Sequence, residues 1–177
     1  GVAPGRPADI AFARTAPDKE MAMGGTSVIR RQMKATWTGA RGRGEFPFLA
    51  FIPKKEGRVP ALLFLNLRNG TMDPDRRTTD PRWDAEQIVA RGYAAISVCY
   101  EDISPDEPHD FNVKPFDSFE TAAERTDRSW CAISAWAWGL RRVMDWIETV
   151  SEIDAKRVIV AGHSRGGKTA LWAGVQD

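Results

Sequence analysis

One short segment near the end of the chain carries residues that could do chemistry of two unrelated kinds. Residues 162–169 read Gly-His-Ser-Arg-Gly-Gly-Lys-Thr. The first five match G-x-S-x-G, the nucleophile elbow of serine hydrolases, with Ser164 as the candidate nucleophile. All eight match G-x-x-x-x-G-K-[ST], a phosphate-binding loop in which Lys168 and Thr169 would contact phosphate and magnesium. Both motifs require a strand before them and a helix after them, so the segment alone does not decide.

The nucleophile-elbow interpretation requires small residues beside the serine. The turn is tight and strained, and it projects the serine Oγ above the sheet. Gly162 and Gly166 supply the room that this turn needs. The helix that follows offers a backbone N–H and a positive dipole end to a developing oxyanion. The segment is therefore compatible with ester or amide hydrolysis.

The elements that must position this segment are alternating strands and helices. Nearly continuous apolar runs indicate strands buried on both faces of a sheet, whereas apolar residues at helical spacing indicate amphipathic helices. This alternation predicts an α/β fold with a mostly parallel sheet, in the three-layer sandwich of an α/β-hydrolase. The predicted strands are 61–67, 94–99 and 157–161, and the predicted helices are 81–91, 130–149 and a helix from the motif to about residue 173.

The order of elements favours the hydrolase over the phosphate-binding loop. Residues 28–37 and 46–52 predict an antiparallel hairpin with a Gly-rich turn, and the first predicted buried strands and helices follow it. In nucleotide-binding proteins the phosphate loop usually opens the domain, whereas an α/β-hydrolase elbow follows the fifth strand. The loop at residues 68–70 sits where that fold supplies its second oxyanion N–H.

Composition excludes several classes of function. The 177 residues contain 25 Lys and Arg against 24 Asp and Glu, which argues against nucleic acid or an anionic membrane as the main partner. No apolar run approaches the ~20 residues of a membrane-spanning helix. Cys99 and Cys131 are too few for a disulfide scaffold or a multi-cysteine zinc site, although one disulfide between them stays open. We expect a monomer without a metal or cofactor.

The two ends suggest a piece of a longer domain. Residues 1–27 show neither helical nor strand period and predict an arm or linker, with 28–177 forming the N-terminal part of one catalytic domain. A hydrolase triad of this fold runs Ser, acid, His along the chain, so we expect its acid and base beyond Asp177. His109 precedes Ser164 and would break that order. The piece alone is therefore expected to be inactive, with an open sheet edge.

For three other groups of residues the sequence predicts a structural role. Loop 100–119 is acidic and is expected to be a solvated pocket rim, with a cation site as the alternative. The tryptophans of predicted helix 130–149 are expected in the core. The basic residues of the hairpin predict a solvated face, with a polyanion groove as the alternative; they are Arg30, Arg31, Lys34, Arg41 and Arg43.

The region from Arg128 to Asp177, above all Gly162 to Trp172, resembles the glucuronoyl esterases, as do residues 65–67, 91–94 and 100–106. These carbohydrate esterases hydrolyse 4-O-methyl-glucuronate esters that join lignin to xylan. The resemblance implies that Ser164 is the nucleophile, that Arg165 stabilises the oxyanion and that Lys168 contacts the uronate hydroxyls. It also implies a secreted or periplasmic enzyme.

Alternatives to that function remain open at the level of the sequence. An acetyl-xylan esterase of the same fold is the close alternative: it removes small acyl groups from sugar hydroxyls, whereas a glucuronoyl esterase cuts on the acid side of a uronate. The phosphate-loop NTPase stays a remote alternative. A carbohydrate-binding protein with an inactive elbow is a third, since exposed tryptophans could stack on sugar rings. His163 is expected to support the elbow, because a side chain next to Ser164 does not easily reach its Oγ as the triad base.

Overall fold

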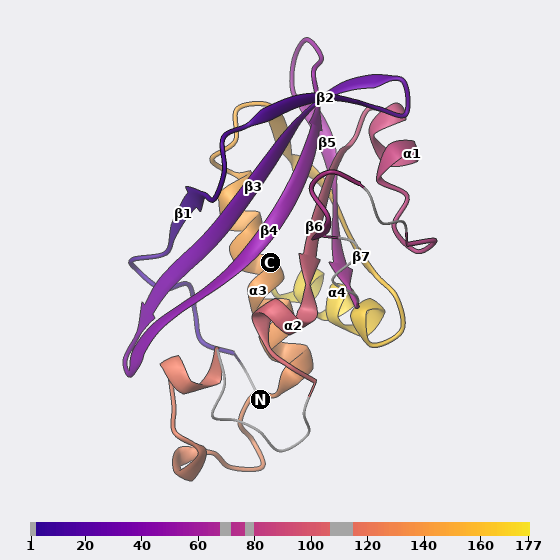
Figure 1. Ribbon diagram of the computed structural model, residues 1–177. Helices are drawn as coiled ribbons and strands as arrows, with labels where there is room; N and C mark the ends of the chain where they lie inside the picture. Colours follow the sequence, from indigo (N-terminus) through magenta and orange to yellow (C-terminus); the bar gives the residue numbers. More distant parts are fainter. Residues whose placement is uncertain (1–2, 68–71, 77–79, 107–114) are drawn as a thin grey trace.

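The computed structural model describes residues 3–67, 72–76, 80–106 and 115–177 (Figure 1). The predicted oxyanion loop at 68–70 and His109 lie outside the described residues.

One mixed sheet forms the frame of the molecule. Its strand order is β1-β3-β4-β6-β5-β7, and β2 also pairs with β3. The pairs β5–β6 and β5–β7 are parallel, whereas the remaining pairs are antiparallel. The strands are β1 (Ala11–Arg14), β2 (Lys19–Met23), β3 (Thr26–Gly39), β4 (Gly42–Pro53), β5 (Val59–Asn66), β6 (Ala94–Cys99) and β7 (Ile153–Gly162).

Helices cover both faces of this sheet, which confirms the expected α/β class. A smaller apolar cluster joins α1 to residues of β2, β3, β4 and β6. On the opposite face, the main core packs α3 and α4 against the same sheet. The helices are α1 (Ala85–Ala90), α2 (Tyr100–Ile103), α3 (Ala132–Ile147) and α4 (Arg165–Gln176), with short 3₁₀ turns at Phe116–Ser118 and Ala122–Glu124.

The prediction that residues 1–27 form an arm or linker without regular secondary structure is wrong. Residues 11–14 and 19–23 form β1 and β2, and both pair antiparallel with β3. Most of their side chains are exposed or half-buried, so no apolar alternation marks them in the sequence. Backbone pairing with the long hairpin strand holds them in place.

The predicted helix 81–91 begins later than expected. Asp80 accepts a hydrogen bond from the Arg82 N–H at 2.8 Å and closes a turn instead of capping the helix. Asp84 is the N-cap of α1, and its Oδ1 accepts from the Gln87 N–H at 3.0 Å. Gly92 has φ 87°, which confirms it as the glycine that ends this helix.

The tryptophans of α3 are core residues, as predicted. Trp136, Trp138 and Trp146 are each at most 3% exposed, and Trp130 just before the helix is 4% exposed. Trp138 packs edge-to-face on Trp37 of β3 with ring centroids 4.9 Å apart. These rings therefore hold α3 against the sheet and are not available for stacking on sugars.

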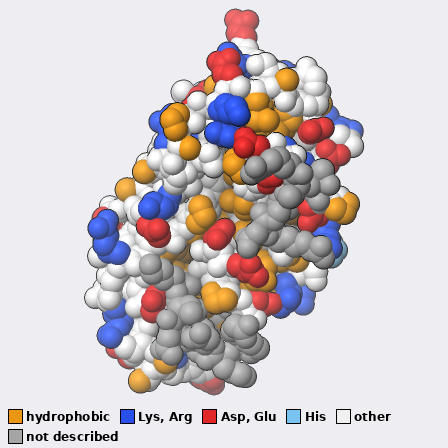
Figure 2. Space-filling view, viewed as in Figure 1, with side chains coloured by type: hydrophobic (Ala, Val, Ile, Leu, Met, Phe, Trp, Pro, Cys, Tyr) orange, Lys and Arg blue, Asp and Glu red, His pale blue; other side chains and the backbone are white. Residues whose placement is uncertain are grey.

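The solvated face predicted for the basic hairpin is present only in part. Arg41 and Arg43 are exposed, whereas Arg30 and Arg31 are buried. Arg30 pairs with Asp75 at 3.0 Å, and Lys34 pairs with Glu45 at 3.0 Å. Figure 2 shows acidic and basic side chains intermixed over the face that it presents. The charge of Arg30 is thus offset by an acid outside the hairpin and that of Lys34 by an acid of β4, so the polyanion groove gains no support from these residues.

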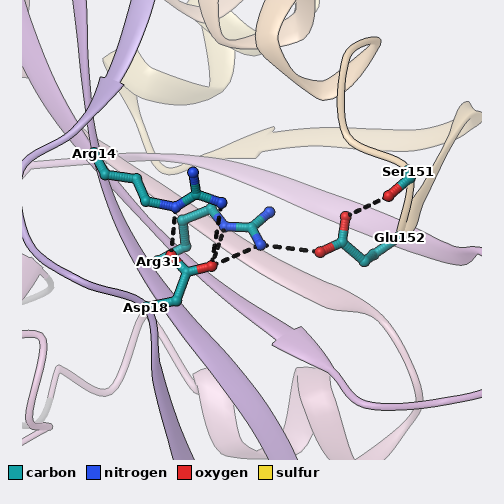
Figure 3. A network of polar contacts seen from close by, with 5 residues as sticks. All are labelled: Arg14, Asp18, Arg31, Ser151 and Glu152. Carbon is teal, nitrogen blue, oxygen red and sulfur yellow. Dashed lines mark hydrogen bonds and ion pairs between the residues drawn. The ribbon is translucent and has the colours of Figure 1, made fainter.

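Arg31 links three parts of the fold (Figure 3). Its side chain is only 8% exposed and donates to Asp18 at 2.8 Å and to Glu152 at 2.9 Å. Asp18 lies between β1 and β2, whereas Glu152 precedes β7. Asp18 also accepts from Arg14 at 2.9 Å. This network ties the first strands to the turn that starts the motif-bearing strand.

We predict that this network gives acid-dependent stability. Partial burial is the largest single effect and raises the pKa of Asp18 and of Glu152. The hydrogen bonds to each carboxylate and the charge of Arg31, with Arg14 adding at Asp18, together outweigh burial and lower both pKa values. Acids with lowered pKa stabilise the fold above their unfolded pKa and lose that contribution as pH falls through the folded one. Arg31→Met should cost about 1–2 kcal/mol at pH 7 in urea unfolding, and this difference should shrink between about pH 5 and 3.

The exposed Arg14 provides the control for that measurement, because it pairs with the same Asp18. Arg14→Met should cost at most about 0.5 kcal/mol. An Arg31→Met difference that stays constant from pH 7 to pH 3 would show that packing, and not the ion pairs, accounts for the loss.

Candidate active site

The candidate site is the sharp turn between β7 and α4 (Figure 1). Ser164 lies in this turn as the N-cap of α4, with φ 56° and ψ −119°. A positive φ is costly for a residue with a Cβ and marks strained backbone. The strain expected of a nucleophile elbow is therefore present at the serine that the motif singles out.

The Ser164 side chain does not cap its own helix. An N-cap serine ordinarily accepts a hydrogen bond from the first turn of its helix, but Ser164 makes no such side-chain bond, and the residue is exposed. Backbone groups close the turn instead: the Gly166 N–H donates to the His163 carbonyl at 2.8 Å, and the Gly167 N–H to the Ser164 carbonyl at 3.0 Å. The first helical N–H, on Arg165, has no intrahelical acceptor and can serve an anion.

A close backbone contact requires glycine at position 162, and the room for a side chain is tight at Gly167 but ordinary at Gly166. A Cβ on Gly162 would lie 2.4 Å from the carbonyl carbon and oxygen of Gly166. On Gly167 it would lie 3.2 Å from the Gly162 carbonyl oxygen, and on Gly166 it would lie 3.4 Å from that of Leu65. The turn thus brings strand and helix backbones together, most tightly at Gly162.

The geometry disfavours the phosphate-loop reading of the same segment. Thr169 is fully buried, and its Oγ1 donates to the Arg165 carbonyl at 3.0 Å, so the hydroxyl does not face a magnesium site. The N–H groups of Gly166, Gly167 and Lys168 already bond to carbonyls of residues 163 and 164. They are not arranged around an anion as a phosphate loop requires.

Arg165 has an acidic partner from another part of the chain. Its Nη1 donates to Oδ2 of Asp106, which follows α2. Tyr100, at the start of α2, lies close enough that the Arg165 charge affects its pKa: burial raises that pKa first, then the hydrogen bond to Glu101, and Arg165 opposes the rise. The structure therefore brings the acidic loop after β6 to the elbow.

The other predicted site residues are exposed. Lys168 lies in the first turn of α4, on the same helix end as Ser164, and His163 precedes the serine. Cys99 and Cys131 are both free, so they form no disulfide. Burial raises the pKa of the Cys99 thiol to about 11, which keeps it neutral and unreactive at pH 7.

Asp106 is the site residue that sequence reasoning did not single out. It is one of several acids in a loop that was expected to be solvated. The only sequence signal for it was the resemblance of residues 100–106 to the glucuronoyl esterases. Within the described residues no group of His, Cys, Asp and Glu could hold a metal ion, so the cation-site alternative gains no support there.

Apolar side chains are exposed on β7 and α4 in the described part of the chain. β7 ends the strand order, and its Ile159 is 49% exposed. The neighbouring α4 exposes Leu171 by 72% and Val175 by 70%.

None of the helices in the described part of the chain is long and apolar enough to cross a membrane.

Solved structures share this fold over the whole chain. A promiscuous CE15 esterase from a marine bacterial metagenome is 30% identical, with a TM-score of 0.78, and the match covers 100% of this chain and 51% of that one. A glucuronoyl esterase from Solibacter usitatus is 28% identical, with a TM-score of 0.76 and the same two coverages.

Sequence comparisons point to the same family. Carbohydrate esterase MZ0003, from an unknown prokaryotic organism, is 33% identical over an alignment 193 positions long, and the match covers 89% of this chain and 43% of that protein. A 4-O-methyl-glucuronoyl methylesterase of Hypocrea jecorina is 49% identical over 45 residues, 24% of this chain and 10% of the enzyme. The chain thus spans less than half of these curated relatives. The family described as "Glucuronyl esterase, fungi" matches residues 87–177, and the chain belongs to the glucuronoyl esterase family.

Proposed function

We propose that this chain contributes the nucleophile to a serine carboxylic-ester hydrolase that cleaves 4-O-methyl-glucuronoyl esters between lignin and glucuronoxylan. The observation that carries the proposal is the strained, uncapped Ser164 at the junction of β7 and α4. Family membership supplies the substrate class. Such a substrate lies in the plant cell wall, which supports a secreted or periplasmic location.

The chemistry follows from the groups around Ser164. Its Oγ attacks the ester carbonyl while a general base takes the proton, and the carbonyl oxygen becomes an oxyanion. The Arg165 N–H at the helix N-terminus can donate to that oxyanion, and the guanidinium adds further fixed donors. The triad acid and base follow the serine in chain order in this fold, so they are expected beyond Asp177.

The proposed function is tested by substrate choice in the protein that carries this sequence. Benzyl glucuronate and methyl glucuronate should be hydrolysed, whereas acetylated xylan should be a much poorer substrate. Preference for acetylated xylan would establish an acetyl-xylan esterase instead. Magnesium-dependent ATP binding without ester hydrolysis would support the alternative hypothesis of a phosphate-loop NTPase.

We predict that Lys168 acts in substrate binding. An ammonium that donates to uronate hydroxyls binds ester and transition state alike, and its loss should raise KM more than it lowers kcat. Lys168→Met should raise KM for benzyl glucuronate about tenfold in steady-state kinetics. Lys156→Met, at another exposed lysine in β7, is the control and should leave KM unchanged. An unchanged KM in Lys168→Met would remove Lys168 from the site.

A further inference from the structure

The guanidinium of Arg165 is held by a carboxylate that lies 59 residues earlier in the chain. Arg165 Nη1 donates to Asp106 Oδ2, and the Asp106 side chain is 25% exposed while that of Arg165 is 56% exposed. Arginine has several rotatable bonds, and one so exposed would otherwise sample many orientations. The ion pair restricts the guanidinium of the residue that directly follows Ser164.

The segment that carries Asp106 is itself anchored in the core. The Trp136 indole N–H donates to the Ser104 carbonyl at 2.8 Å, and Trp136 is 1% exposed. Tyr100 packs edge-to-face on the same indole with centroids 5.0 Å apart, and its hydroxyl donates to Glu101 at 2.9 Å. The backbone two residues before Asp106 is thus fixed to α3, which makes the carboxylate a defined support.

We propose that Asp106 is the positioning residue for Arg165: it fixes the guanidinium toward the developing oxyanion and offsets its positive charge. This inference rests on the proposed function. Ester hydrolysis converts a neutral substrate into an alcohol and a carboxylic acid that ionises at neutral pH. An unpaired guanidinium would retain that anion, whereas a guanidinium paired with Asp106 releases it more readily.

Steady-state kinetics on benzyl glucuronate, with glucuronate as the product inhibitor, test this role. Asp106→Asn should lower kcat about tenfold, because one oriented donor group is weakened and not removed. KM for the neutral ester should stay within about twofold, while the inhibition constant of glucuronate should fall about threefold or more. Asp106→Glu should recover most of kcat and restore weak product binding.

A double-mutant cycle separates positioning from a general structural effect. In an Arg165→Ala background, Asp106→Asn should have almost no further effect on kcat or on inhibition by glucuronate. Equal effects with and without Arg165, or unchanged kcat and inhibition in Asp106→Asn, would overturn the proposal.

Asp154→Asn is the matched control variant. Asp154 pairs with Arg157 in β7, and their side chains are 29% and 59% exposed, close to the values of the Asp106–Arg165 pair. This control should leave kcat and product inhibition unchanged. Ser164→Ala is run in parallel: turnover that survives in it would overturn the proposed function, whereas a failure of the Asp106 role alone leaves Ser164-dependent turnover intact.

Discussion

Replacement of Ser164 by Ala is expected to reduce kcat on glucuronate esters by at least about 10³-fold, because the proposed acyl-enzyme forms on its Oγ. The loss should appear in kcat and not in KM, since the Oγ is small and contributes little to ground-state binding. Single-turnover measurements with benzyl glucuronate check it. Turnover within tenfold of wild type would mean that Ser164 is not the nucleophile.

Two further variants separate chemistry from strain at this position. Ser164→Gly should be equally inactive, yet more stable than Ser164→Ala by about 1 kcal/mol in urea unfolding, because glycine adopts φ 56° without steric cost. Ser27→Ala, at an exposed position of β3, should leave both activity and stability unchanged. If glycine does not stabilise the turn, the backbone there is not strained as the structure indicates.

The buried strands and the main helices could be predicted because their sequence patterns are strong. β5 and β6 are nearly continuous apolar runs, and α3 repeats apolar residues at helical spacing. β1 and β2 could not be predicted, since their short segments expose most side chains and gain their structure from pairing with β3. Where backbone pairing replaces side-chain burial, the local pattern carries no signal.

The same contrast holds within the site. Ser164, Arg165 and Lys168 lie in one local motif, so their common location follows from chain neighbourhood. The pairing of Arg165 with Asp106 depends on how the loop after β6 packs on α3, which no local pattern encodes. Similarly, the two acids that pair with Arg31 come from two turns that are distant in the chain. Only the folded structure brings both of them to Arg31.

Gly162→Ala is expected to abolish the elbow, with the second-largest loss of activity. The new Cβ would lie 2.4 Å from the Gly166 carbonyl group, a backbone contact that no side-chain rotation relieves. Strand and helix must then separate, which moves Ser164 and the Arg165 N–H. We expect kcat/KM to fall about 100-fold or more and the free energy of unfolding to fall by about 2–4 kcal/mol.

Gly174→Ala, the same substitution within α4, is expected to have the opposite effect on stability from Gly162→Ala. There the nearest atom to a Cβ is Val160 Cγ1, at an ordinary 3.7 Å. Replacing a glycine inside α4 should raise the free energy of unfolding by about 0.5–1 kcal/mol and leave kcat/KM unchanged. Urea unfolding and steady-state kinetics on both variants compare them directly. If Gly162→Ala matched Gly174→Ala in stability and activity, the close approach at Gly162 would not be what holds Ser164 in its strained, uncapped conformation.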